Sequence, residues 1–270
     1  METMRDLFEN KRKRDLLFHY TKACNAISIL ATKTLLFSRF NRLNDINESQ
    51  RIIFCKSQED NLLEKCDNAL LSYEQISLTC DWSPNCDFTL RGFDLMTMWG
   101  HYADFGNGVC IVFNKKLIEE KCELDPECYH DYVEYQKDYD NAIIFDTNNP
   151  EEEIKEKIKD LFFCKSEQWA HEQEYRIVRK RRNASIVSLD VSNCIEAIIF
   201  SVLGADVNQQ PYQTKDYWAL NKVRGDIPLI GYYHRDLDGG RSLYQVSDRK
   251  TIWSNKQIVD LTDGSYVLDI

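Results

Sequence analysis

The order in which apolar patterns change along the chain constrains the fold more than any other feature. Helical spacing dominates the first half, where apolar residues recur every three or four positions in 23–30, 62–73, 94–103 and 154–162. The second half carries mainly strand patterns, at 174–178, 185–189, 197–202, 230–233, 242–246 and 266–270. Because helices come early and strands late, without a regular alternation, the sequence predicts an α+β fold with a mixed or mostly antiparallel, strongly curved sheet.

Short strands also interrupt the first half, at 15–20, 34–38, 76–80 and 109–113, and a polar loop is expected at 41–48. Thr21 lies between the first strand and the first helix, where it would cap that helix. Only 5 prolines and 10 glycines occur, and no linker or internal repeat divides the chain. We therefore expect one domain over 1–270, with a motif-bearing core at about 15–205 and a β-rich extension at 206–270.

The charge balance bears on the kind of partner. The net charge of -10 and the pI near 5.1 argue against a surface that binds nucleic acids through their phosphates without sequence preference. Two basic runs, 11–14 and 179–182, offer a local basic face for such a partner. Runs of this kind are also common as solvated surface charges, and this interpretation stands beside the first.

The cysteine pattern indicates a cytoplasmic protein without a metal site. The 10 cysteines are scattered, without a CxxC pair or a paired histidine motif. The first residues lack the apolar core of a signal peptide, and no apolar run approaches the roughly 20 residues that a membrane-crossing helix needs. We expect reduced thiols and no association with a membrane.

Three segments combine residue types that carry chemistry. The first is His19-Tyr20-Thr21, where the first strand ends and the first helix begins. Strand ends of this kind often hold ligand-binding residues. A packed, hydrogen-bonded histidine at a strand end would give the same pattern.

The second segment, 98–108, reads MWGHYADFGNG. Its helical apolar stripe accounts for Met98, Trp99 and Tyr102 as core residues. His101 lies off the centre of that stripe, so core packing does not explain it.

The third segment begins at Lys165 and continues to Arg176. On a strand, Glu172, Glu174 and Arg176 would share one face. Two acids beside an arginine form a structural ion-pair row in many proteins. A carboxylate on a rigid strand also suits the cleavage of a glycosidic bond, because it stabilises an oxocarbenium-like centre. The pattern leaves both interpretations open.

These three segments, in this order and spacing, resemble a large bacterial family of unknown function over residues 15 to 205. The loop Leu43-Asn44-Asp45 with Glu48 fits the same family. The segment that opens with His19 also resembles the start of nucleic-acid-modifying toxins of the ADP-ribosyltransferase superfamily, in its histidine-tyrosine-glutamate branch. That resemblance implies a split, curved sheet with NAD, as substrate, in the cleft.

The second resemblance also implies roles for individual residues. His19 would hold the adenosine ribose, the backbone at Tyr20 would hold the nicotinamide amide, and Glu174, with Glu172 as the alternative, would be the catalytic glutamate. The aromatic residue that stacks on nicotinamide would be Phe40 or Tyr102. Arg39 would contact the pyrophosphate, and an ordinary surface arginine is the alternative interpretation of this residue. The remaining NAD contacts are expected from Thr21, Ser38, His101 and Arg176.

The resemblance predicts an ADP-ribosyltransferase that modifies a macromolecule, with RNA or DNA favoured over protein. Its setting would be a toxin or a phage-defence effector, with an antitoxin protein as a second partner. An NAD glycohydrolase would use the same residues with water as acceptor. A non-catalytic sensor or interaction domain would use them as a buried polar network. The Glu174→Gln variant is expected to lose activity but to keep its thermal midpoint within a few degrees.

Overall fold

The computed structural model describes residues 15–40, 45, 52–55, 61–88, 90–137, 142–146, 148–181, 188–202, 215–233, 242–245 and 251–254. The basic run 11–14, the strand expected at 266–270 and the loop 41–48 apart from Asp45 lie outside these residues. Arg182 lies outside them too.

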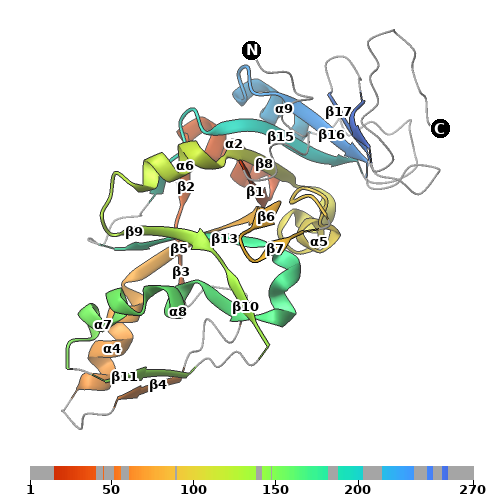
Figure 1. Ribbon diagram of the computed structural model, residues 1–270. Helices are drawn as coiled ribbons and strands as arrows, with labels where there is room; N and C mark the ends of the chain where they lie inside the picture. Colours follow the sequence, from red (N-terminus) through yellow and green to blue (C-terminus); the bar gives the residue numbers. More distant parts are fainter. Residues whose placement is uncertain are drawn as a thin grey trace.

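A ten-stranded mixed sheet forms the centre of the fold (Figure 1). The strand order is β18-β17-β16-β15-β8-β1-β5-β13-β9, and β3 also pairs with β5. Within this sheet the pairs are antiparallel except β15 with β16, which confirms the expectation of a mixed sheet. The strands are β1 (Leu16–Thr21), β3 (Ser38–Arg39), β5 (Tyr73–Cys80), β8 (Val109–Asn114), β9 (Cys128–Tyr132), β13 (Glu174–Lys180), β15 (Ile195–Val202), β16 (Leu229–Tyr233), β17 (Ser242–Gln245) and β18 (Thr251–Ser254).

Both faces of this sheet are covered, because its central strands carry apolar side chains on both sides. On one face Leu17 and Ile111 pack in a cluster that includes residues of α2, α6 and α9. On the other face Phe18 and Val112 pack with residues of α5. These helices are α2 (Ala23–Thr32), α5 (Met96–Tyr102), α6 (Lys115–Cys122) and α9 (Lys215–Val223).

A third apolar cluster lies beside the start of β5 and the second half of β13, where Tyr73 and Val178 join it (Figure 1). Its remaining members come from Phe40, three helices and a parallel pair of strands. Pro150 stands at the start of one of these helices with three acids in its first turn, as expected from helix-start chemistry. The elements are α4 (Leu62–Leu71), α7 (Pro150–Glu156), α8 (Ile158–Phe162), β4 (Ile52–Cys55) and β11 (Ala142–Phe145).

The central strands β1 and β5 separate near the end of β1. β1 pairs with β8 along its whole length, whereas the pairs between the described strands β1 and β5 involve Leu17 and Phe18 alone. On the other side, β5 stays paired with β13 from Thr79 to Tyr73. The sheet is therefore open beside His19.

Most of the expected elements are present, and several differences occur. The helix expected at 94–103 spans Met96–Tyr102. Thr21 does not cap a helix; it ends β1, and its Oγ1 accepts a hydrogen bond from the Asn25 side chain at 3.2 Å. The C-terminal region contains α9, which the sequence did not predict, because Leu220 is the one residue of this helix that is fully buried.

Candidate functional site

A cavity of about 300 Å³ lies where β1 and β5 separate. Ligand pockets in proteins begin at roughly this volume, so the space suits a nucleoside-sized group and not a whole dinucleotide. The lining residues come from β1, β5, α5, the segment 36–45 and the region around β13: Phe18, His19, Tyr20, Leu36, Ser38, Asp45, Gln75, Ile76, Ser77, Leu78, Thr79, Met98, Tyr102, Lys165, Glu172 and Glu174.

The register of β5 and β13 gives the cavity a polar wall. Thr79 pairs with Glu174, and Ser77 pairs with Arg176, so these side chains share one face of the two strands. Gln75 lies on the same face of β5, two residues from Ser77. Buried polar groups require hydrogen-bond partners, and within this wall Arg176 supplies them to Glu174 and Gln75 supplies one to Ser77.

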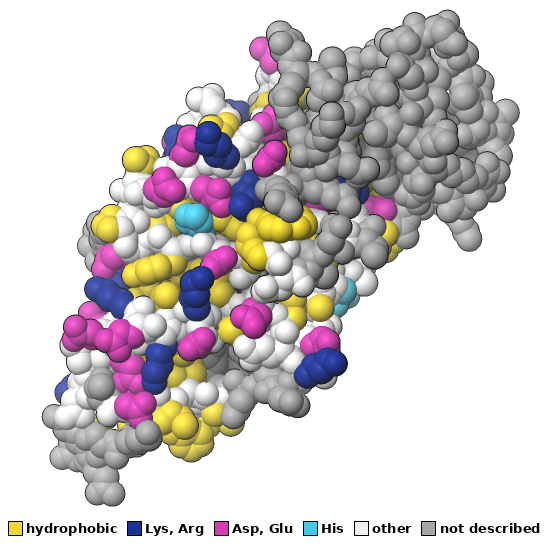
Figure 2. Space-filling view, viewed as in Figure 1, with side chains coloured by type: hydrophobic (Ala, Val, Ile, Leu, Met, Phe, Trp, Pro, Cys, Tyr) yellow, Lys and Arg dark blue, Asp and Glu magenta, His cyan; other side chains and the backbone are white. Residues whose placement is uncertain are grey.

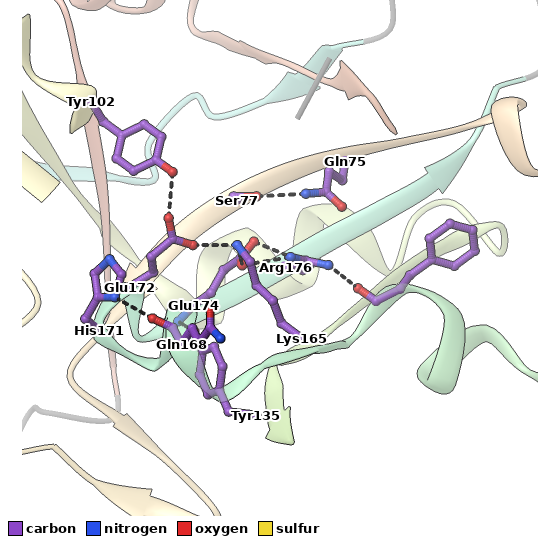
Figure 3. Close-up of polar contacts among 11 residues, drawn as sticks. Gln75, Ser77, Tyr102, Tyr135, Lys165, Gln168, His171, Glu172, Glu174 and Arg176 are labelled. Atoms are coloured by element: carbon purple, nitrogen blue, oxygen red, sulfur yellow. Dashed lines mark hydrogen bonds and ion pairs between the residues drawn. The ribbon is translucent and has the colours of Figure 1, made fainter. Parts of the chain in front are cut away.

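Glu174 is held by two cations (Figure 3). Arg176 donates from Nε and Nη2 to the two carboxylate oxygens at 2.6 and 2.9 Å, and Lys165 Nζ lies 3.5 Å from Oε2. The Arg176 side chain is 0% exposed and also donates to the Phe162 carbonyl at 2.7 Å. The Glu174 N–H donates to Tyr135 Oη at 2.9 Å. Both the side chain and the backbone of Glu174 are therefore fixed.

Glu172 does not lie on the strand with Glu174, and the expected strand row is wrong at this point. Glu172 ends the 3₁₀ helix η4 (Glu167–Glu172), and Gln173 has a left-handed φ of 49°, so β13 begins at Glu174. Glu172 nevertheless lines the cavity. Lys165 Nζ donates to it at 2.6 Å, and Tyr102 Oη donates to its other oxygen at 2.6 Å.

The two main titratable groups of the cavity have shifted pKa values. Burial raises the pKa of the Glu174 carboxyl, but the charges of Arg176 and Lys165 outweigh burial and lower this pKa to about 2. Burial lowers the pKa of His19 to about 4, against a smaller raising effect of its hydrogen bond with the Ser77 backbone. At neutral pH the cavity thus combines a carboxylate with an uncharged imidazole.

Tyr20 and Thr21 hold the end of β1 in place. Tyr20 Oη donates to the Gly92 carbonyl at 2.6 Å, and its ring meets the Trp99 ring edge-on at 5.2 Å. A Cβ on Gly108 would lie 2.3 Å from the Thr21 carbonyl oxygen. The loop after α5 therefore packs directly on the backbone of β1, and this brings the first two motif segments together.

The other residues expected to bind NAD lie in several places. Ser38 lines the cavity, whereas Arg39 beside it on β3 is exposed and its Nε lies 3.7 Å from Glu74. Phe40 is buried in the third apolar cluster. His101 is exposed, with its ring 6.5 Å from that of His171. Of the two aromatic residues expected to stack on nicotinamide, Tyr102 is thus the one at the cavity.

Part of this site is not predicted from the sequence. The sequence pattern assigns no function to Lys165, Gln75, Ser77 or Thr79. The alternation of polar and apolar residues in 73–80 is a pattern that predicts a solvent-facing side of a strand. Gln75 and Thr79 are nevertheless 2% and 1% exposed. Residues of α5 and η4 line the same cavity, and local sequence does not show that these distant segments meet β5.

The described residues contain neither a membrane-crossing helix nor a cluster of metal ligands. No described helix is long and apolar enough to cross a membrane. Within the same residues, no group of three or more His, Cys, Asp or Glu side chains is placed to hold a metal ion.

Comparison with known proteins gives one similarity. No curated protein and no solved structure matches the chain. A family profile described as a protein of unknown function (DUF2971) matches residues 98–177. The match begins at Met98 in α5 and ends within β13, so it includes Glu174 but not His19. Over residues 98–177 the chain is therefore similar to this family of unknown function, which confirms that part of the expected resemblance.

Proposed function

We propose that the cavity binds the nicotinamide and ribose of NAD and that the protein transfers ADP-ribose from NAD to a macromolecule. The observation that carries the proposal is that His19, Tyr102 and Glu174, from three distant segments, line one cavity. The cavity volume of about 300 Å³ accommodates the reacting half of NAD, with the pyrophosphate and adenosine outside it. His19 would then contact the nicotinamide-side ribose and not the adenosine ribose that the resemblance implies for it.

The chemistry follows from the charge at the reacting carbon. When the bond from ribose C1′ to nicotinamide breaks, the electron pair leaves with nicotinamide, and positive charge develops on the ribose. A fixed carboxylate stabilises that charge, and Glu174 is ionised and rigidly held. The uncharged His19 adds no opposing positive charge. The acceptor then forms the new bond to C1′ with its lone pair and releases a proton.

The nature of the acceptor rests on the resemblance to nucleic-acid-modifying toxins, which favours RNA or DNA. The described part of the basic run does not add support, because its side chains are paired with acids. Arg179 lies 2.7 Å from Asp125, and Lys180 lies 2.7 Å from Glu151. Figure 2 shows acidic and basic side chains interspersed on one face of the molecule. A protein acceptor therefore stays as the alternative.

The experiment uses NAD labelled in the ADP-ribose part, incubated with the protein alone and then with total RNA, denatured DNA or lysate protein. Nicotinamide release together with label on one class of macromolecule supports the transferase and identifies that class. Nicotinamide release without transfer indicates the glycohydrolase. Absence of both would overturn the proposal and favour the non-catalytic domain, in which the ion pairs around Glu174 serve the fold.

A further inference from the structure

Gln75 has an acceptor atom that the described part of the chain leaves without a partner. Its side chain is 2% exposed and lines the cavity. Among the described residues, no group donates a hydrogen bond to Oε1. Such buried acceptors are rare in folded proteins because leaving them unpaired costs free energy. An atom of this kind in a cavity wall indicates a ligand that brings a donor.

A hydrogen bond with Ser77 sets which end of the Gln75 amide is already used. Gln75 Nε2 donates to Ser77 Oγ at 3.0 Å (Figure 3). With the nitrogen turned to Ser77, the oxygen must be the other, unpartnered end of the amide.

The Glu174 carboxylate has little capacity left for another donor. It accepts two hydrogen bonds from Arg176 and a longer contact from Lys165. A carboxylate offers about four lone-pair positions, so these three contacts occupy most of it. A second acceptor beside Glu174 would therefore serve a bound hydroxyl. Gln75 belongs to the same cavity wall, because it lies on the same face of β5 as Thr79, which pairs with Glu174.

We propose that Gln75 Oε1 accepts a hydrogen bond from the 2′-hydroxyl of the ribose that carries nicotinamide. This inference rests on the proposed function, which places C1′ of that ribose beside Glu174, and C2′ is the adjacent carbon. Gln75 then orients the ribose, while Glu174 acts through its charge. Gln75 is a positioning residue that selects a hydroxylated sugar over a 2′-deoxy sugar.

The test measures the affinity of wild type and Gln75→Met for carba-NAD, a non-hydrolysable analogue that keeps the ring hydroxyls. It then measures their affinity for the same analogue without the 2′-hydroxyl on the ring that carries nicotinamide. In wild type, loss of the hydroxyl should weaken binding roughly tenfold, as expected for one hydrogen bond to an otherwise unpaired acceptor. Gln75→Met should weaken carba-NAD binding to a similar degree. The variant should then show no further loss with the 2′-deoxy analogue, because the partner is already gone.

Tyr73→Phe is the matched control. Tyr73 lies on the same strand, is 1% exposed and has a hydroxyl without a hydrogen-bond partner among the described residues, but it does not line the cavity. Removing that hydroxyl should leave carba-NAD affinity unchanged. Urea unfolding of Tyr73→Phe should show stability equal to or above that of wild type, since it loses an unpaired group. Gln75→Met should stay close to wild type, because it loses an unpaired acceptor and also one hydrogen bond to Ser77.

Each outcome decides one claim. Equal carba-NAD affinity in wild type and Gln75→Met overturns the role of Gln75 and leaves the proposed function standing. If the affinities change as expected but wild type releases no nicotinamide from NAD, the role of Gln75 in binding is supported and the transferase is overturned. A wild type that binds neither analogue overturns both.

Discussion

Replacing Glu174 by Gln tests how the cavity is held together. The side chains of Glu174, Arg176 and Lys165 are 4%, 0% and 6% exposed. Glutamine keeps the shape but removes the negative charge, so the Arg176 guanidinium would be buried without its main partner. Breaking a buried ion pair in this way costs roughly 3–5 kcal/mol.

The lowered pKa of Glu174 gives a similar free energy of destabilisation. Its fall from 4.5 to about 2 in the folded protein corresponds to about 3 kcal/mol of stability at neutral pH. Because this folded-state pKa is lowered, the contribution is complete above pH 4.5 and is lost as the pH falls toward 2. The thermal midpoint of Glu174→Gln should therefore fall by roughly 10 °C, more than sequence reasoning expects.

A double-mutant cycle isolates this effect. Arg176→Met alone should also be destabilised, because it leaves Glu174 without its closest cation. The double variant Glu174→Gln/Arg176→Met removes both charges and keeps the Lys165–Glu172 pair. It should be at least about 2 kcal/mol more stable than the sum of the single effects predicts. Urea unfolding at pH 7, followed by tryptophan fluorescence, measures all four proteins. A Glu174→Gln cost below about 1 kcal/mol, or additive effects, would refute the buried ion-pair reasoning.

Three further variants test other parts of the site. His19 has a folded-state pKa of about 4 against 6.5, so wild-type stability should fall by about 2–3 kcal/mol as the pH drops from 6.5 to 4, and His19→Gln should remove that slope in urea unfolding. Gly108→Ala should cost about 1–3 kcal/mol, since its Cβ meets the Thr21 carbonyl; unchanged unfolding would contradict that contact. Tyr102→Phe keeps the ring but loses the hydrogen bond to Glu172, so kcat/KM for NAD should fall less than tenfold, and less than in Tyr102→Ala.

Local patterns were sufficient to predict most elements that position the site. The apolar runs of β1 and β8, and the helical stripe of α5, are long enough to predict a strand or a helix without tertiary information. The prediction failed where one backbone angle decides the structure. The left-handed conformation of Gln173 separates Glu172 from β13, and a glutamine gives no local indication of that conformation.

The composition of the site was only partly predictable, because burial of polar residues is a tertiary property. Glu174 and Arg176 were singled out by their spacing on one face of a strand. Lys165 lies on the short strand β12 (Cys164–Ser166), and its contacts with Glu172 and Glu174 depend on the tertiary placement of that strand. The surroundings of Gln75, which is buried in the cavity wall with its Nε2 on Ser77 of the same strand, are also a tertiary property that no sequence pattern encodes.

The most direct test of the central claim is nicotinamide release from NAD by wild type and by the Glu174→Gln/Arg176→Met variant, both confirmed folded by their unfolding transitions. The account predicts release by wild type and at least a hundredfold slower release by the variant, because the carboxylate that stabilises the ribose cation is gone. Release by the folded variant at the wild-type rate, or no release by wild type, would contradict it.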